Sequence, residues 1–174
     1  MKNLLITGAA GFLGSHLGDE AIGRGWKVIG IDNFFRGKPQ HIPKHPNFSF
    51  EKIDMLNLAE IKNIINQYKP AVIAHYAAIN GTEYFYERPW QVLSDNINIT
   101  MNLVKALEEL EYVPQKFVYA SSSEVYGEKP RQIPTKEDDL IALDIAAIRD
   151  SYASSKAFGE FVVKADLKRL IYAK

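Results

Sequence analysis

Apolar residues along the chain follow two patterns that alternate. Short, continuous apolar runs predict β-strands that are buried on both faces. Runs with apolar residues three or four positions apart predict amphipathic helices. The alternation predicts an α/β fold, a doubly wound parallel sheet covered by helices on both sides. The expected strands are 3–7, 26–32, 48–54, 71–76 and 116–122, and the expected helices are 12–24, 58–68, a long helix after residue 89, and 151–169.

The long helix after residue 89 carries one apolar stripe, made of Trp90, Leu93, Ile97, Met101, Val104 and Leu107. Three other segments are predicted to be loops. They are residues 33–47, with three prolines and a glycine, residues 77–89, and residues 127–150. The last connection has 24 residues, and connections of that length are usually functional or mobile.

Three glycines, Gly8, Gly11 and Gly14, follow the first expected strand and open the first expected helix. Glycine permits a tight turn, lets backbone N–H groups approach a phosphate, and lets a helix pack closely on a sheet. The start of a helix also favours negative charge. The spacing G-x-x-G-x-x-G differs from the dinucleotide fingerprint G-x-G-x-x-G, although its context is the same. The turn predicts a dinucleotide pyrophosphate site in a Rossmann-type fold, and a glycine-rich turn of another α/β protein is the alternative.

Asp32 ends the second expected strand, 24 positions after Gly8. An acid at this place can accept hydrogen bonds from the adenosine ribose hydroxyls of a dinucleotide. Its charge would repel a 2′-phosphate, so NAD is favoured over NADP, and Arg36 is close enough in sequence to weaken that exclusion. A solvated Asp-Asn turn is the alternative for Asp32 taken alone.

Tyr152 and Lys156 are four residues apart in an expected helix, so they lie on one face. A free tyrosine has a pKa near 10 and is a poor base at neutral pH. A lysine ammonium beside it, with a cationic nicotinamide above, is expected to lower that pKa and favour the phenolate. An ordinary surface pair is the alternative for these two residues alone.

Serines 121–123 end the fifth expected strand. Ligands of open α/β sheets bind at this carboxyl edge. A serine hydroxyl there can hydrogen-bond the substrate oxygen whose proton Tyr152 takes. Five features together therefore predict an NAD-dependent enzyme. They are the glycine turn, Asp32, the serines 121–123, Tyr152 and Lys156.

The composition of the chain argues against several classes of partner and cofactor. The 174 residues suit one domain, and the 21 basic and 21 acidic residues cancel. This balance gives no support for nucleic-acid or anionic-membrane partners. The chain has no cysteine, and no group of residues has metal-ligand spacing, so no metal is expected. The apolar runs are too short to cross a bilayer, and a cytoplasmic protein is the default expectation.

Seven segments, TGAAGFLGSHL, GIDN, KID, AHYAA, NINITMNL, ASSSEVYG and YASSK, extend over nearly all of the chain. Together and in this order they resemble the extended short-chain dehydrogenase/reductase family, the NAD-dependent nucleotide-sugar epimerases and dehydratases. For catalysis the resemblance implies Ser122, Tyr152 as the base, and Lys156 as its partner. For the cofactor it implies Gly8, Gly11, Phe12, Leu13, Gly14, Asp32, Asn33, Arg36, Asp54, Met55, Ala77, Ala78, Asn96, Tyr152 and Lys156.

The implied reaction begins when Tyr152 takes a proton from the sugar 4-hydroxyl and a hydride passes to NAD, which gives a 4-keto sugar. Dehydratases of the family carry an Asp-Glu pair after the catalytic serine or threonine, but here the pair is Ser123 and Glu124. Dehydration is therefore disfavoured, and epimerisation is the first expectation. The Ser-Glu pair and Arg149 also look like decarboxylases of nucleotide-linked uronic acids. A surface position is the alternative for Arg149.

Family members are usually longer and build the nucleotide-sugar pocket from their C-terminal portion. Residues 1–174 are therefore expected to form the NAD-binding domain with the Ser/Tyr/Lys residues, and the C-terminal substrate domain is expected to be missing. A catalytically silent or NAD-sensing module is the second function class. An incomplete sheet leaves an exposed edge and apolar surface, which predicts a homo-oligomer.

Overall fold

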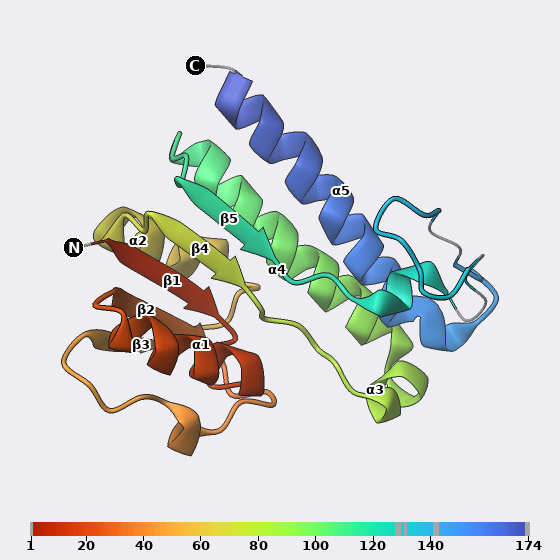
Figure 1. Cartoon of the computed structure of the whole chain (residues 1–174), viewed down its shortest axis with the longest axis horizontal. Coiled ribbons are helices and arrows are strands. Elements are labelled where there is room, and N and C mark those ends of the chain that lie inside the picture. The colour runs from red at the N-terminus through yellow and green to blue at the C-terminus, as the bar shows by residue number, and fades with distance from the viewer. Residues whose placement is uncertain (1, 128–129, 131, 141–142, 173–174) are drawn as a thin grey trace.

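The computed structural model describes residues 2–127, 130, 132–140 and 143–172. Its centre is a five-stranded parallel sheet with the strand order β3-β2-β1-β4-β5 (Figure 1). The strands are β1 (Asn3–Thr7), β2 (Lys27–Asp32), β3 (Phe48–Lys52), β4 (Val72–His75) and β5 (Lys116–Tyr119). The helices are α1 (Phe12–Gly23), α2 (Leu58–Tyr68), α3 (Thr82–Glu87), α4 (Pro89–Glu109) and α5 (Ser151–Tyr172), with short 3-10 turns at Pro39–His41, Ser123–Tyr126 and Ile148–Asp150.

The two faces of the sheet bury different helices. Leu5 of β1 packs with apolar residues of α2 and α4 on one face. Its neighbours Leu4 and Ile6 point to the other face and pack with residues of α1, because successive side chains of a strand alternate between the faces. Helix α5 lies along α4 (Figure 1). The predicted doubly wound α/β fold is therefore confirmed.

The order of the strands creates a crevice at the carboxyl edge of the sheet. From β1 the chain moves outward to β2 and β3, and then returns to place β4 on the other side of β1. The loops that leave β1 and β4 therefore diverge, and ligands of open α/β sheets bind where this happens. The glycine turn follows β1, and the segment with Ala77 and Ala78 follows β4.

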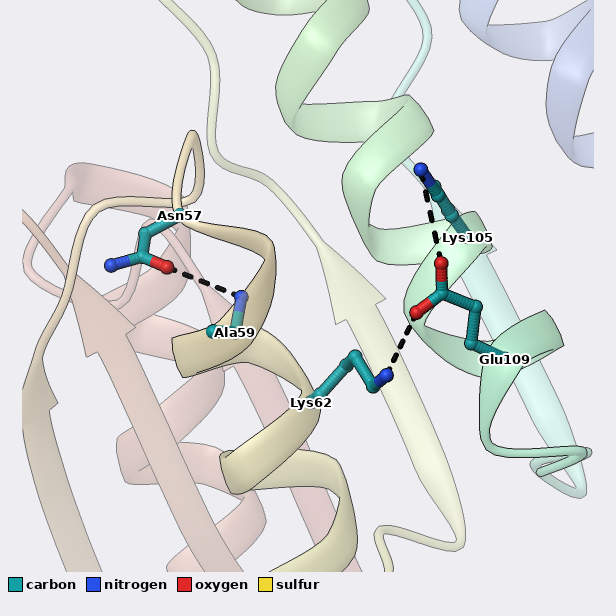
Figure 2. A network of polar contacts seen from close by, with 5 residues as sticks. All are labelled: Asn57, Ala59, Lys62, Lys105 and Glu109. Atoms are coloured by element: carbon teal, nitrogen blue, oxygen red, sulfur yellow. Dashed lines mark hydrogen bonds and ion pairs between the residues drawn. The ribbon is translucent and has the colours of Figure 1, made fainter.

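Helices α2 and α4 are joined by polar contacts as well as by the core. Asn57 accepts a hydrogen bond from the Ala59 N–H at the start of α2, and Lys62 Nζ lies 2.7 Å from Glu109 Oε2 at the end of α4 (Figure 2). Lys105 Nζ lies 3.8 Å from the same carboxylate. All three charged groups are partly exposed, and water screens such ion pairs, so they contribute little to stability. The apolar core holds this layer together.

The segment after β4 differs from its prediction as a loop. Residues Thr82–Glu87 form α3, which buries Phe85 against Tyr152. The helix is only six residues long, too short for its apolar spacing to stand out in the sequence. Tertiary packing on Phe85 stabilises it.

The buried face of α4 also differs from the predicted stripe. Trp90 is 77% exposed and Met101 is 44% exposed, whereas the polar residues Asn96 and Thr100 are buried. Both polar side chains are hydrogen-bonded inside the protein, which makes their burial tolerable. Val104 and Leu107 of the predicted stripe are buried, so the apolar stripe identified the buried face in the second half of the helix but not at Trp90 and Met101.

No helix in the described ranges is both long and apolar enough to span a bilayer.

Candidate functional site

A cavity of about 240 Å³ opens at the carboxyl edge of the sheet. Its walls come from the glycine turn, from the segments after β2, β3 and β4, and from one side of α4. The lining residues are Gly8, Gly11, Ile31, Asp32, Asn33, Phe35, Arg36, Gly37, Ile53, Asp54, Met55, Leu56, Tyr76, Ala77, Ala78, Ile79, Gln91, Asp95 and Ile99. The structure thus brings together predicted cofactor residues that are far apart in the sequence.

The glycine turn is tight at Gly8 and Gly14. Gly8 has φ +69°, and a Cβ on it would lie 2.9 Å from the Ala77 nitrogen. A Cβ on Gly14 would overlap the Gly8 carbonyl oxygen. Gly11 is the N-cap of α1 and has no side chain to bond the first N–H groups of the helix. Those donors remain for a negatively charged ligand.

Phe12 and Leu13 follow this turn, and both side chains are mostly exposed. Neither occurs among the described residues that line the cavity. Their backbone N–H groups, at the start of α1, are the atoms that can bind a pyrophosphate.

Asp32 connects the glycine turn to the segment after β2. Its Oδ2 accepts a hydrogen bond from the Ala10 N–H at 3.0 Å, and its Oδ1 accepts one from the Phe34 N–H at 2.7 Å. Asn33 Nδ2 donates to Asp54 Oδ2 at 3.1 Å. These bonds hold the ends of β2 and β3 side by side, where a carboxylate faces the cavity.

Arg36 lines the cavity, and its guanidinium reaches α3. The guanidinium carbon lies 5.8 Å from the centre of the Tyr84 ring, and the Phe35 ring lies 5.6 Å from the same ring. The segment after β2 therefore touches the helix that follows β4.

Asn96 supports the cavity from behind. Its Oδ1 accepts a hydrogen bond from the Ile79 N–H at 2.7 Å, and its Nδ2 donates to the Ile79 carbonyl at 3.0 Å and to Ser155 Oγ at 3.2 Å. Asn96 is absent from the described lining residues. Its amide groups hold the segment after β4 in place.

Tyr152 stands next to the cavity. The side chain is 7% exposed, and its ring stacks on Phe85 with centroids 4.9 Å apart. Tyr152 belongs to an apolar cluster with Ile79 and Phe85, and Ala78 packs against this cluster while it also lines the cavity. The cluster that holds the phenol therefore borders the cavity at Ala78 and Ile79, and Tyr152 itself is outside the described lining.

Without a cofactor, the pKa of Tyr152 lies above its ordinary value although Lys156 is close by. Burial and the negative charge of Glu124 raise this pKa more than hydrogen bonding with Ser122 lowers it. The same Ser122 contact places the predicted serine beside the phenol. In the free protein Tyr152 is therefore a protonated phenol at neutral pH.

Lys156 is buried between two tyrosine rings. Its Nζ donates to the Ala120 carbonyl at 2.7 Å and lies 5.0 Å from the Tyr119 ring centre and 5.8 Å from the Tyr152 ring centre. Burial lowers the pKa of Lys156 to about 8. The ammonium is thus held near the phenol, with one donor bonded to the backbone.

The lowered pKa of Lys156 predicts how stability depends on pH. Below pH 8 the lysine is charged in both the folded and the unfolded state, so the desolvation penalty is fully present. Above its unfolded pKa of 10.5 the lysine is neutral in both states. The free energy of unfolding should therefore gain up to about 3 kcal/mol from this group as pH rises between these values.

Chemical denaturation at a series of pH values measures this contribution. Lys156→Met should remove it, and Lys164→Met, which changes an exposed lysine of the same helix, should leave it unchanged. Equal pH slopes in wild type and Lys156→Met would contradict the burial of a charged ammonium.

Ser123 and Glu124 line a second hollow of about 190 Å³ with Gly127, Arg149 and Asp150. Arg149 Nη2 donates to Glu124 Oε2 at 3.3 Å. Ser122 Oγ accepts a hydrogen bond from the Glu124 N–H at 3.2 Å, which orients the serine at the start of the 3-10 turn. The predicted Ser-Glu pair and Arg149 therefore share one polar pocket.

Sequence reasoning missed part of the cavity wall on α4. Gln91, Asp95 and Ile99 all line the cavity and stand four residues apart, on one helix face. This repeat was visible in the sequence, but the predicted apolar stripe assigned another face of the helix to the core.

The chain is similar in sequence and fold to known proteins. The sequence model of the NAD dependent epimerase/dehydratase family matches residues 4–166. The UDP-N-acetyl-alpha-D-glucosaminuronate decarboxylase of Bacillus cytotoxicus is 34% identical over 160 residues, which are 91% of this chain and 48% of that protein. The UDP-glucuronate 4-epimerase of Thermodesulfobacterium geofontis is 30% identical over 171 residues, which are 93% of this chain and 50% of that protein.

Among solved structures, the Thermus thermophilus UDP-glucose 4-epimerase in complex with NAD superposes with a TM-score of 0.84. It is 27% identical, and the match covers 97% of this chain and 51% of that one. The chain spans about half the length of the curated relatives it matches. The match over residues 4–166 shows that the chain belongs to the NAD-dependent epimerase/dehydratase family.

Proposed function

We propose that the cavity binds NAD and that Ser122, Tyr152 and Lys156 act on the 4-hydroxyl of a nucleotide sugar, with 4-epimerisation as the outcome. This proposal rests on the position of Tyr152 relative to Ser122, Lys156 and the cavity. Ser122 and Lys156 both contact it, and Ala78 joins its cluster to the cavity. The relatives named above act on UDP-linked sugars according to their names.

The residues of the cavity fit a dinucleotide. The glycine turn leaves no space for a Cβ at two positions and leaves N–H groups of α1 for phosphate oxygens. We assign the ribose hydroxyls of the adenosine to Asp32 and Asn33, and the adenine to the walls with Asp54 and Met55. Ala77 and Ala78 continue the groove toward Tyr152.

Side chains of the protein then take up the proton of the sugar hydroxyl. Ser122 hydrogen-bonds the sugar O4, and the Tyr152 phenolate accepts the O4 proton. The phenol is protonated in the free protein, so it must lose its proton before it can act as a base. The ammonium of Lys156 and the positive charge of bound NAD together favour the ionised form, since a positive charge near a phenol stabilises the phenolate. When bound, NAD supplies a hydride acceptor for C4 and can return the hydride. Return to the opposite face of the 4-keto sugar gives the epimer.

Decarboxylation of a nucleotide-linked uronic acid is the second candidate function. The pocket with Glu124 and Arg149 favours it, because a guanidinium is a natural partner for a sugar carboxylate. A Bacillus cytotoxicus relative is named as a decarboxylase of such a sugar.

Incubation of the protein with NAD and UDP-glucuronate, or with UDP-glucose, tests both functions. Formation of the 4-epimer supports the first function, and release of carbon dioxide from the uronate supports the second. Binding of NAD with neither product would contradict both and would leave a silent or NAD-sensing module.

Cofactor preference gives a direct test of Asp32. We expect NADP to bind at least about tenfold more weakly than NAD, since like charges a few ångströms apart repel by more than 1 kcal/mol near a protein surface. Asp32→Asn should bring the two dissociation constants close together, as measured by titration calorimetry. Asp95→Asn, which removes a charge from the α4 wall, is the control and should leave the ratio unchanged. An unaltered ratio in Asp32→Asn would remove Asp32 from the ribose site.

Self-association is also a proposal. Met101 of α4 and Phe158 and Phe161 of α5 expose apolar side chains, and exposed apolar surface of this kind often marks a contact between proteins. Light scattering after gel filtration should give more than one chain per particle. The cytoplasm as the location of the protein stays a prediction.

A further inference from the structure

His75 is a buried titratable residue that the proposed reaction does not use. It ends β4 and is 1% exposed. Its Nδ1 lies 2.7 Å from Thr7 Oγ1, and its Nε2 lies 3.1 Å from Thr100 Oγ1. The ring therefore joins the end of β1 to the middle of α4.

The partners of Thr7 determine which ring nitrogen carries the proton. Thr7 Oγ1 accepts hydrogen bonds from the Tyr76 N–H at 3.1 Å and from the Ala77 N–H at 3.0 Å. A hydroxyl oxygen has two acceptor sites and one proton, so both acceptor sites are occupied. The Thr7 hydroxyl must therefore donate to His75 Nδ1, and this nitrogen carries no proton.

The other side of the ring agrees with this assignment. A neutral imidazole has one N–H, which must then be on Nε2 and must point to Thr100 Oγ1. The Thr100 hydroxyl in turn donates to the Asn96 carbonyl at 2.9 Å. Burial and the charge of Lys156 lower the pKa of His75 to about 3, so the ring is neutral at physiological pH. The hydroxyl of Thr7, the Nε2–H of His75 and the hydroxyl of Thr100 thus each donate to the next member of the chain.

The chain of hydrogen bonds ends at the cavity wall. Tyr76 and Ala77 both line the cavity, and the Ala77 nitrogen is the atom nearest to the position of a Cβ on Gly8. The Thr7 hydroxyl thus holds the backbone after β4 against the glycine turn, and His75 orients that hydroxyl.

We infer that His75, as the neutral Nε2–H tautomer, is a positioning residue for the cofactor. Through Thr7 it sets the backbone of Tyr76 and Ala77 that forms the groove beside Gly8. This inference rests on the proposed function only for the identity of the ligand, NAD.

Nitrogen NMR of the imidazole tests the tautomer directly. At pH 7 the long-range proton–nitrogen correlation of His75 should show a protonated Nε2 and an unprotonated Nδ1. A proton on Nδ1, or on both nitrogens, would overturn the inference. This result does not depend on whether the protein binds NAD.

Substitutions of Thr100 test the positioning role, because Thr100 is the partner of His75 Nε2 and is not itself among the described residues that line the cavity. Thr100→Val removes the acceptor of Nε2–H at nearly constant volume. It should lower NAD affinity about tenfold, the effect of one buried group left unpaired. Thr100→Ser keeps the hydroxyl and should restore the affinity. Thr7→Val and Thr7→Ser form a second pair with the same expected contrast.

Affinity is measured by calorimetry on samples that circular dichroism shows to be folded, so that loss of stability is not mistaken for loss of binding. If wild type and Thr100→Val bind NAD equally, the positioning role is wrong while NAD binding stands. If wild type does not bind NAD, the proposed function fails and the tautomer remains a separate result.

Discussion

Tyr152→Phe is expected to lower turnover of the nucleotide sugar about 10²- to 10⁴-fold, the range of general acid–base catalysis. Phenylalanine keeps the ring that stacks on Phe85 and faces Lys156, but it has no oxygen to accept the sugar proton. Affinity for NAD should therefore remain, because the cavity is lined by other residues. Product formation and calorimetric NAD titration measure the two effects separately.

Tyr112→Phe is the matched control. Its phenol donates to the Pro70 carbonyl at 3.0 Å, before β4 begins, whereas Ala77 and Ala78 of the cavity follow the other end of that strand. Loss of this bond should lower stability by about 1 kcal/mol and leave turnover intact. If Tyr152→Phe retains full turnover, Tyr152 is not the base and the proposed mechanism is wrong.

Gly14→Ala is the second substitution with a large expected effect. The added methyl would overlap the Gly8 carbonyl oxygen and would lie 2.8 Å from the Ala9 Cα. These are backbone atoms, which cannot move aside as a flexible side chain could. We expect a loss of about 3 kcal/mol or more of unfolding free energy. In any folded fraction the glycine turn should be displaced and NAD affinity lost.

Gly23→Ala gives the contrast within the same helix. A Cβ on Gly23 meets no described atom within 4 Å, and alanine is the better helix former. Stability should therefore rise by up to about 1 kcal/mol with NAD affinity unchanged. Urea denaturation measures both variants. Similar effects of the two substitutions would show that the close approach at Gly14 has no part in the fold.

The local features of the site could be predicted from the sequence because each has a short-range pattern. Continuous apolar runs indicated the strands, and the glycine spacing after β1 indicated the tight turn that Gly8 and Gly14 form. The carboxyl ends of parallel strands meet at one edge, so Asp32 and Ser122 could be placed at that edge without coordinates. A spacing of four residues placed Tyr152 and Lys156 on one face of α5.

Features that depend on burial could not be predicted in this way. The sequence pattern predicted a lowered pKa for Tyr152 with Lys156 and a nicotinamide beside it, but it gave no sign that the folded chain without a cofactor raises this pKa by removing water from the phenol. Asn96 was expected among the cofactor residues, in the helix that supports the site, but its hydrogen bonds to the backbone of Ile79 could not be predicted from the sequence. Phe85 was in a predicted loop, and its stacking on Tyr152 is a contact between segments that are distant in the sequence.

The sequence by itself therefore determined the order in which strands and helices follow along the chain, the glycine turn, and the types of residue at the carboxyl edge of the sheet. These features follow from periodicity and from backbone sterics over a few positions. Tertiary structure alone decided which face of α4 is buried, how the phenol and the ammonium titrate, and how Thr7, His75 and Thr100 are hydrogen-bonded. Thr7 and His75 are 68 positions apart. Desolvation and hydrogen bonds over such separations exist only after the sheet has brought the strands together.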